Sequence, residues 1–275
     1  ITSIQKLVDT AKSIANQALQ APSGYTTKAS ASIAAPTGAG PLAVAGTAGD
    51  LTNAGTNSLQ GKTLIFTPAT GSALTLTIDN TTGAGKVNSI DSINSALTTA
   101  GIGLTASLNT DGSLTFTSTN DNASQTLTAV ATAAAGTVGL TGTATFTLTD
   151  TTAAGGGAGK PVADAASQTT RASLITQYNA VIDQIKTTAQ DSSFNGINLL
   201  NGDQLKLVFN ETGKSTLTIQ GVTFDPAGLG LKSLASGTDF LDNANTNKVL
   251  DSLNSASSTL RSQASTFGSN LSIVQ

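Results

Sequence analysis

Three segments of this chain carry apolar residues at alternating steps of three and four, and this spacing constrains the fold more than any other feature. Side chains three and four positions apart lie on one face of an α-helix. The stripes are Ile4, Leu7, Ala11, Ile14 and Ala18; then Ile175, Tyr178, Ile182, Ile185 and Ala189; then Leu250, Leu253, Leu260, Ala264, Phe267, Leu271 and Val274. Each stripe predicts a helix with one narrow apolar face.

The three stripes together predict one helical bundle with coiled-coil-like packing. A ligand-binding role is the alternative, but apolar stripes at this spacing usually form a core. We expect Arg171 and Gln177 to face outward, and the polar Ser257 interrupts the third stripe. The residues expected inside the bundle are Leu7, Ile14, Ile182, Ile185, Leu253, Leu260 and Phe267.

The middle of the chain, from about residue 25 to 165, is rich in Thr, Ala, Gly and Ser and has the periodicity of β-structure. Apolar residues alternate with polar ones in 74–79 and in 114–117, as half-buried strands require. Asp111 and Gly112 lie between 104–108 and 114–116, which is a signal for a β-hairpin.

Two further elements are expected in this middle region, and one beyond it. Val87, Ile90, Ile93, Asn94 and Leu97 fit a short helix that ends near Gly101, and Ala144–Leu148 fits another strand. After Gly202, alternation at Leu205, Leu207 and Phe209 resumes at Leu217 and Ile219, with a turn at 211–214. This pattern predicts a second hairpin, docked beside the helices.

These patterns predict an α+β fold in five parts. A bundle of long helices carries a docked β-hairpin, and a β-rich outer domain is inserted into the bundle. The parts are 1–24, the first core helix; 25–165, the inserted domain; 166–202, the second helix; 203–242, the hairpin and a loop region; and 243–275, the last core helix.

The composition argues against an enzyme. The chain has no His, Cys, Trp or Met, and Glu211 is its only glutamate. It therefore lacks an imidazole base, a thiolate nucleophile and a thiolate metal site. A serine–lysine nucleophile is conceivable, but no motif singles out such a pair. We expect no catalytic, cofactor-binding or metal-binding residues.

Other ligand classes have equally little support. Asn120–Asn122, and Asn109 with Asp111, offer oxygen atoms to calcium, but the same residues favour turns, which we expect instead. Gly155–Gly157 is followed by no Lys–Ser/Thr pair, so Gly155–Gly159 with Lys160 and Pro161 predicts a linker rather than a phosphate loop. With 13 scattered Lys and Arg and a net charge of −3, nucleic acid is not an expected partner. No apolar run reaches the length of about 18 residues that membrane insertion requires.

Three separated segments carry sequence phrases of one known protein family. Residues 4–20, IQKLVDTAKSIANQALQ, are similar to the flagellin inner-core helix. Residues 175–200, ITQYNAVIDQIKTTAQDSSFNGINLL, contain the phrase FNG found at the end of the flagellin connecting helix. Residues 253–275, LNSASSTLRSQASTFGSNLSIVQ, resemble the returning C-terminal helix, and 221–231, GVTFDPAGLGL, resembles alphaproteobacterial flagellins. One departure is that the large insert precedes FNG instead of following it.

The resemblance implies an elongated, secreted structural protein: an extracellular subunit of the flagellar filament that serves motility. It adds Phe194, Asn195 and Gly196 to the packing and assembly residues. Both outer helices reach Ile1 and Gln275 without caps, so further terminal segments are expected. The partners implied are other flagellin subunits and, through those segments, the export machinery and a chaperone. Without the segments the chain is expected to stay monomeric.

The alternative function is that of a cell-surface flagellin homologue whose insert binds a polysaccharide or a host surface. A carbohydrate site would use exposed aromatic residues, and the insert offers Tyr25, Phe66, Phe116 and Phe146. These phenylalanines alternate as core residues do, so the support is thin. The threonines of the insert are candidates for O-linked glycans, although Thr also suits exposed strands.

Overall fold

The computed structural model describes residues 1–22, 24–33, 51, 61, 63–67, 72–81, 83–108, 114–125, 127–131, 143–148, 158–159 and 161–274. The chain is of mixed α+β class and divides into two compact units. The helical unit comprises Ile1–Pro22 and Ala165–Gln275, and the insert unit comprises Ser23–Asp164. The insert unit therefore interrupts the helical unit in sequence.

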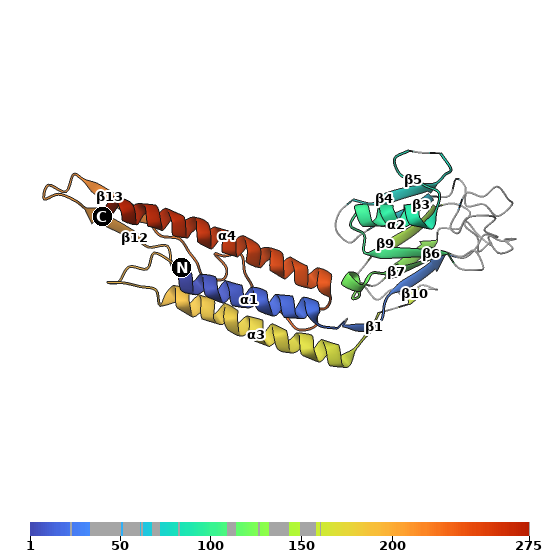
Figure 1. The fold of residues 1–275 in the computed structure, drawn as a ribbon, viewed down its shortest axis with the longest axis horizontal. Coiled ribbons are helices and arrows are strands. Elements are labelled where there is room, and N and C mark those ends of the chain that lie inside the picture. Colours follow the sequence, from blue (N-terminus) through green and yellow to red (C-terminus); the bar gives the residue numbers. More distant parts are fainter. Residues whose placement is uncertain are drawn as a thin grey trace. The chain divides into compact units, whose positions relative to one another are not determined.

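The helical unit is built around α1 (Thr2–Gln20), α3 (Ala165–Gln190) and α4 (Asn243–Val274). Figure 1 shows α3 and α4 running in the same direction, antiparallel to α1. Since α1 packs against both other helices, it is the central helix of this bundle.

Polar side chains close the ends of the helices. The Asp242 carboxylate accepts a hydrogen bond of 3.0 Å from the backbone N–H of Asn245, which caps the start of α4. At the end of α3, the Asn198 side-chain amide donates to the carbonyl oxygens of Ala189 (2.7 Å) and Gln190 (3.0 Å). These contacts satisfy backbone groups that a helix leaves without intrahelical partners.

The segment 221–240 forms no named helix or strand, yet it contributes to the same hydrophobic core as the three helices. The Asn179 side chain on α3 holds this segment, because it donates to the Leu234 carbonyl (2.9 Å) and accepts from the Leu234 N–H (2.8 Å). The buried apolar residues of the segment are Phe224, Leu229, Leu231, Leu234 and Phe240. Irregular chain therefore completes the packing of the helices.

The predicted second hairpin is confirmed. It consists of β12 (Gln204–Val208) and β13 (Thr216–Gln220), which pair antiparallel with Leu207 opposite Leu217. Ile219 is the only buried residue of the two strands, and Phe209, just beyond β12, remains 49% exposed. Most of the hairpin surface is therefore open, in contrast to the docked hairpin expected from the sequence.

The insert unit contains two larger sheets, and Figure 1 labels most of their strands. One has the order β5-β4-β3-β9-β8 and the other the order β10-β2-β7-β6. The strands of the first are β5 (Lys86–Val87), β4 (Leu74–Ile78), β3 (Thr63–Thr67), β9 (Thr143–Leu148) and β8 (Leu127–Ala131). Those of the second are β10 (Ala158–Gly159), β2 (Ser30–Ile33), β7 (Leu114–Ser118) and β6 (Leu104–Leu108).

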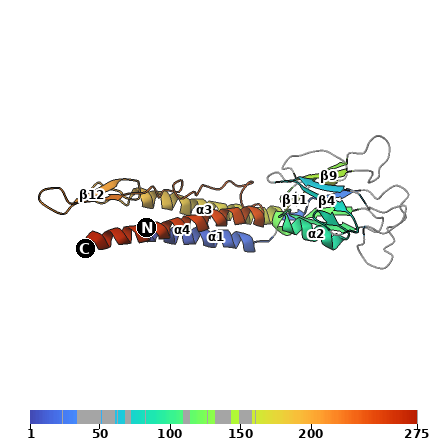
Figure 2. The same ribbon diagram turned by 90° about the horizontal axis from the view of Figure 1, so that it is seen from above.

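The helix predicted in the insert is α2 (Ile90–Thr99), visible in Figure 2, and it packs against β6. Ser89 and Ser92 form a reciprocal capping box at its start. Val87 was wrongly expected in this helix: it pairs with Ile78 as part of β5, because the helix begins only after the Ser89 cap.

The other predictions for the insert have mixed outcomes. The strands at 74–78, 114–118 and 143–148 and the antiparallel pairing of 104–108 with 114–118 are confirmed. Asn109 and the Asp111–Gly112 turn lie outside the described residues, as does Gly155–Gly157. Ala158 and Gly159, expected in the linker, form β10 and pair with β2. Asn120–Asn122 forms a short 3₁₀ helix.

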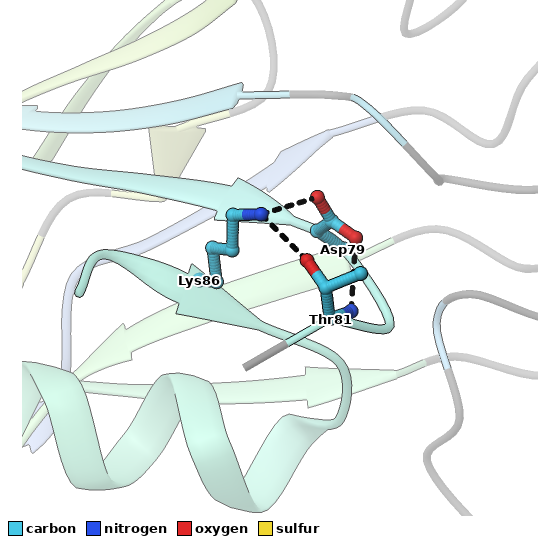
Figure 3. A network of polar contacts seen from close by, with 3 residues as sticks. All are labelled: Asp79, Thr81 and Lys86. Atoms are coloured by element: carbon cyan, nitrogen blue, oxygen red, sulfur yellow. Dashed lines mark hydrogen bonds and ion pairs between the residues drawn. The ribbon is translucent and has the colours of Figure 1, made fainter. Parts of the chain in front are cut away.

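A polar network fixes the loop between β4 and β5 (Figure 3). The Lys86 ammonium contacts the Asp79 carboxylate at 3.0 Å and donates to the Thr81 hydroxyl, while Asp79 accepts from the Thr81 N–H at 2.9 Å. Both charged side chains are partly exposed, so this pair contributes little to stability, on the order of 0–1 kcal/mol. Its role is to hold the loop, not to form a site.

The chain enters and leaves the insert unit through one pair of strands. β1 (Tyr25–Thr27) pairs antiparallel with β11 (Val162–Ala163), and the Asp164 N–H donates to the Gly24 carbonyl at 2.9 Å. The two ends of the insert are therefore neighbours, as an insertion into a helical bundle requires.

This arrangement predicts that the helical unit folds without the insert. Replacing residues 23–164 by a short Gly/Ser linker between Pro22 and Ala165 should preserve α1, α3 and α4, because their core contains no residue of the insert. Far-ultraviolet circular dichroism measures the outcome. Loss of the helical signal on deletion would mean that the insert is needed to fold the bundle.

Candidate functional site

The residues predicted to pack the helices form most of one buried core. Ile14, Ile182, Ile185, Leu253 and Leu260 are each at most 6% exposed. Leu7 and Phe267 pack against the same core but remain half-buried. On α1 the buried face also includes Val8 and Ala15, which the narrow stripe did not contain. The reason is that α1 lies between two helices and buries a wider face than a helix with one neighbour.

The position of Arg171 differs from the one expected from the sequence. It was expected to face outward, but its side chain is 2% exposed, whereas Gln177 is exposed as expected. The guanidinium donates to the Phe240 carbonyl at 2.9 Å, and it also donates to the carbonyl oxygens of Ala21 and Pro22 and to the Asn243 side chain. Burial is possible because these oxygen atoms supply acceptors to the planar donor group.

Arg171 therefore joins three separate parts of the helical unit. Ala21 and Pro22 follow the end of α1, Phe240 ends the irregular segment, and Asn243 begins α4. Polar contacts also join the other end of the bundle, where the Gln5 side chain on α1 donates to the Ser257 hydroxyl on α4 at 2.8 Å. Ser257 is buried, so the polar interruption of the third stripe lies within the packed face.

The phrase FNG forms a tight turn. Asn195 and Gly196 both have positive φ, 50° and 79°, and Phe194 and Ile197 exchange backbone hydrogen bonds of 2.9 and 3.0 Å. Positive φ at both central residues is the geometry of a type I′ turn, which Asn-Gly favours. The turn leaves the Phe194 ring 79% exposed, so this residue does not belong to the core of the described structure.

The apolar stripe of α4 continues past the buried core. Leu253, Leu260, Phe267 and Val274 recur every seven residues and change from fully buried, through half-buried, to 38% exposed. The other row of the same stripe, Leu250, Ser257, Ala264 and Leu271, ends at Leu271, which is 56% exposed. Because Gln5 near the start of α1 meets Ser257, the last turns of α4 extend beyond α1, as Figure 1 shows. We call Phe267, Leu271 and Val274 the exposed seam.

The aromatic residues weighed for carbohydrate binding are mostly unavailable. Phe66 and Phe116 are fully buried, and their rings meet edge to face with centroids 5.3 Å apart. Tyr25 is half-buried on β1, and the side chain of Phe146 lies outside the described residues. Without exposed aromatic rings, these phenylalanines cannot stack on a sugar.

The described residues contain no group of three or more acidic side chains able to hold a metal ion. In the cluster at Asn120–Asn122, the Asn120 side chain instead accepts a hydrogen bond of 3.1 Å from Lys28. Among the helices of the described chain, none is long and apolar enough to cross a membrane.

Because Tyr178 is buried, we expect the helical unit to lose stability at alkaline pH. Burial, and secondarily the charge of Asp239, raises the pKa of its phenol from 10.0 to about 12. The unfolded chain therefore loses this proton first, so the contribution to stability is complete below pH 10 and disappears as the pH rises to about 12. Between about pH 9 and about pH 11.5, the free energy of unfolding measured with urea should fall more for the natural chain than for Tyr178→Phe. Equal losses would exclude Tyr178 as the titrating group.

Comparisons with known proteins leave the family open: neither a protein-family model nor a curated protein matches this chain. The resemblance to flagellin rests on the three quoted segments alone.

Proposed function

We propose that this protein is a structural subunit of a bacterial flagellar filament, and that its helical unit is an elongated flagellin-like bundle. The observation that carries the proposal is the exposed seam, which continues the heptad positions of a buried core onto open surface. A stripe that keeps its spacing beyond its partner helix is typical of a helix that gains a further partner on assembly. The three flagellin-like segments agree with this role.

Burial of the exposed seam would stabilise assembly. Complete burial of a Leu or Val side chain contributes about 1.5–3 kcal/mol. Leu271 is 56% and Val274 38% exposed, so each has part of that free energy still to gain. Repetition of the same contact along a filament would add these modest gains at every subunit.

The remaining roles follow from the same proposal. The insert unit serves as the outer domain. The protein acts outside the cell, in motility, without catalysis. A polysaccharide-binding surface protein is the less favoured alternative, because Phe66 and Phe116 are buried.

A pair of variants in cells that produce the protein tests this function. Leu271→Asp with Val274→Asp should abolish filaments, because two charges would enter the proposed interface. Ser272→Asp is the matched control, since Ser272 is also exposed on the last turns of α4 but lies off the seam. Electron microscopy should show filaments in the control only. Normal filaments in the double variant would refute a role for the seam in assembly.

A further inference from the structure

The helical unit contains a hollow beside its core. Its volume is about 260 Å³, and it is lined by Tyr178 of α3, by Gly230, Leu231, Lys232, Leu234 and Asp239 of the irregular segment, and by residues in the first turns of α4. Such a volume is close to the lower end of known small-ligand sites. All lining residues belong to the helical unit.

Tyr178 is a polar residue that lines this hollow. Tyr178 is 1% exposed and packs edge to face on Phe240, yet no hydrogen bond to its hydroxyl exists among the described residues. Its hydroxyl is not among the buried polar atoms that lack a partner, so a water molecule or a ligand in the hollow can accept its hydrogen bond. Because its pKa is raised to about 12, the phenol keeps its proton at neutral pH and can act as a donor.

Two positive charges from different elements line the same hollow. Lys232 belongs to the irregular segment and Lys248 to α4, and within the described chain neither forms an ion pair. Asp239 is the acidic lining residue, and its carboxylate accepts a hydrogen bond of 2.8 Å from the Ala235 N–H. The charged lining therefore has one more cation than anion. Asn245 and Ser252 add polar groups at the margin.

We propose that this hollow is a binding site for a small organic anion bearing carboxylate groups. Lys232 and Lys248 hold the anionic groups, and the Tyr178 hydroxyl donates to an oxygen atom of the ligand. Charge-assisted hydrogen bonds of this kind are stronger than neutral ones. The inference does not depend on filament assembly, because every residue it uses lies within one copy of the helical unit.

The tyrosine content of the chain provides a direct readout. There are two tyrosines and no tryptophan, so a Tyr25→Phe variant leaves Tyr178 as the sole strong ultraviolet fluorophore. Titration of this variant with citrate should give a saturable fluorescence change below about 10 mM, the range of weak small-molecule affinity. Inorganic phosphate forms a second arm and should bind more weakly, because it spans less of the hollow. No saturation with citrate would overturn the proposal, as would tighter binding of phosphate.

Calorimetry on matched variants identifies the residues. Lys232→Met with Lys248→Met should weaken citrate binding about tenfold or more, and Tyr178→Phe should weaken it about threefold to tenfold. Lys206→Met with Lys214→Met on the hairpin is the control, since it removes the same charge at a distance from the hollow. Equal affinities of the two double variants would overturn the site, because citrate would then respond only to net charge.

Discussion

Replacing Arg171 by Met is expected to lower the free energy of unfolding of the helical unit by about 3–5 kcal/mol. The side chain is 2% exposed and donates to carbonyl oxygens at the end of α1 and just before α4. Met would fill much of the space but would leave those buried acceptors without their donor. Urea unfolding followed by circular dichroism measures the change.

Arg261 is the matched control, because it lies on the exposed surface of α4. Arg261→Met should change stability by less than about 0.5 kcal/mol. Arg171→Lys should recover only part of the loss, since an ammonium group cannot reproduce the planar set of donors. If Arg171→Met were as stable as Arg261→Met, the buried contacts would contribute nothing to the junction between the helices.

Leu260→Ala has the second large expected effect, a loss of about 2–5 kcal/mol. Leu260 is fully buried between α4 and the remainder of the core, so truncation leaves a cavity in a packed region. The same substitution at Leu271, which is 56% exposed on the same helix, should cost less than about 0.5 kcal/mol in the isolated protein. A loss below about 0.5 kcal/mol for Leu260→Ala would remove this residue from the core.

The 3–4 spacing was sufficient to predict the helices and the buried residues at their centres. Ile14, Ile185 and Leu253 lie where the stripes placed them. The width of a stripe was harder to predict, because Val8 and Ala15 are buried only through the position of α1 between two partners. The packing of 221–240 was not predictable from periodicity, since an irregular segment has none.

The burial of Arg171 was not predicted from the sequence. Its position, four residues before Ile175 and seven before Tyr178, continues the buried stripe of α3. An outward position is nevertheless the ordinary expectation for arginine, because a cation rarely enters a core without acceptors. Those acceptors come from Ala21, Pro22 and Phe240, which are far away in sequence, so only the tertiary fold reveals them.

Immunoelectron microscopy tests the central proposal most directly. An antibody raised against residues 23–164 is applied to cells that produce the protein, and the position of the gold label is recorded. The filament proposal predicts label along the whole length of flagellar filaments, and loss of label when the gene is deleted. Label confined to the cell envelope, with filaments bare, would contradict it and would favour a surface-binding role for the insert.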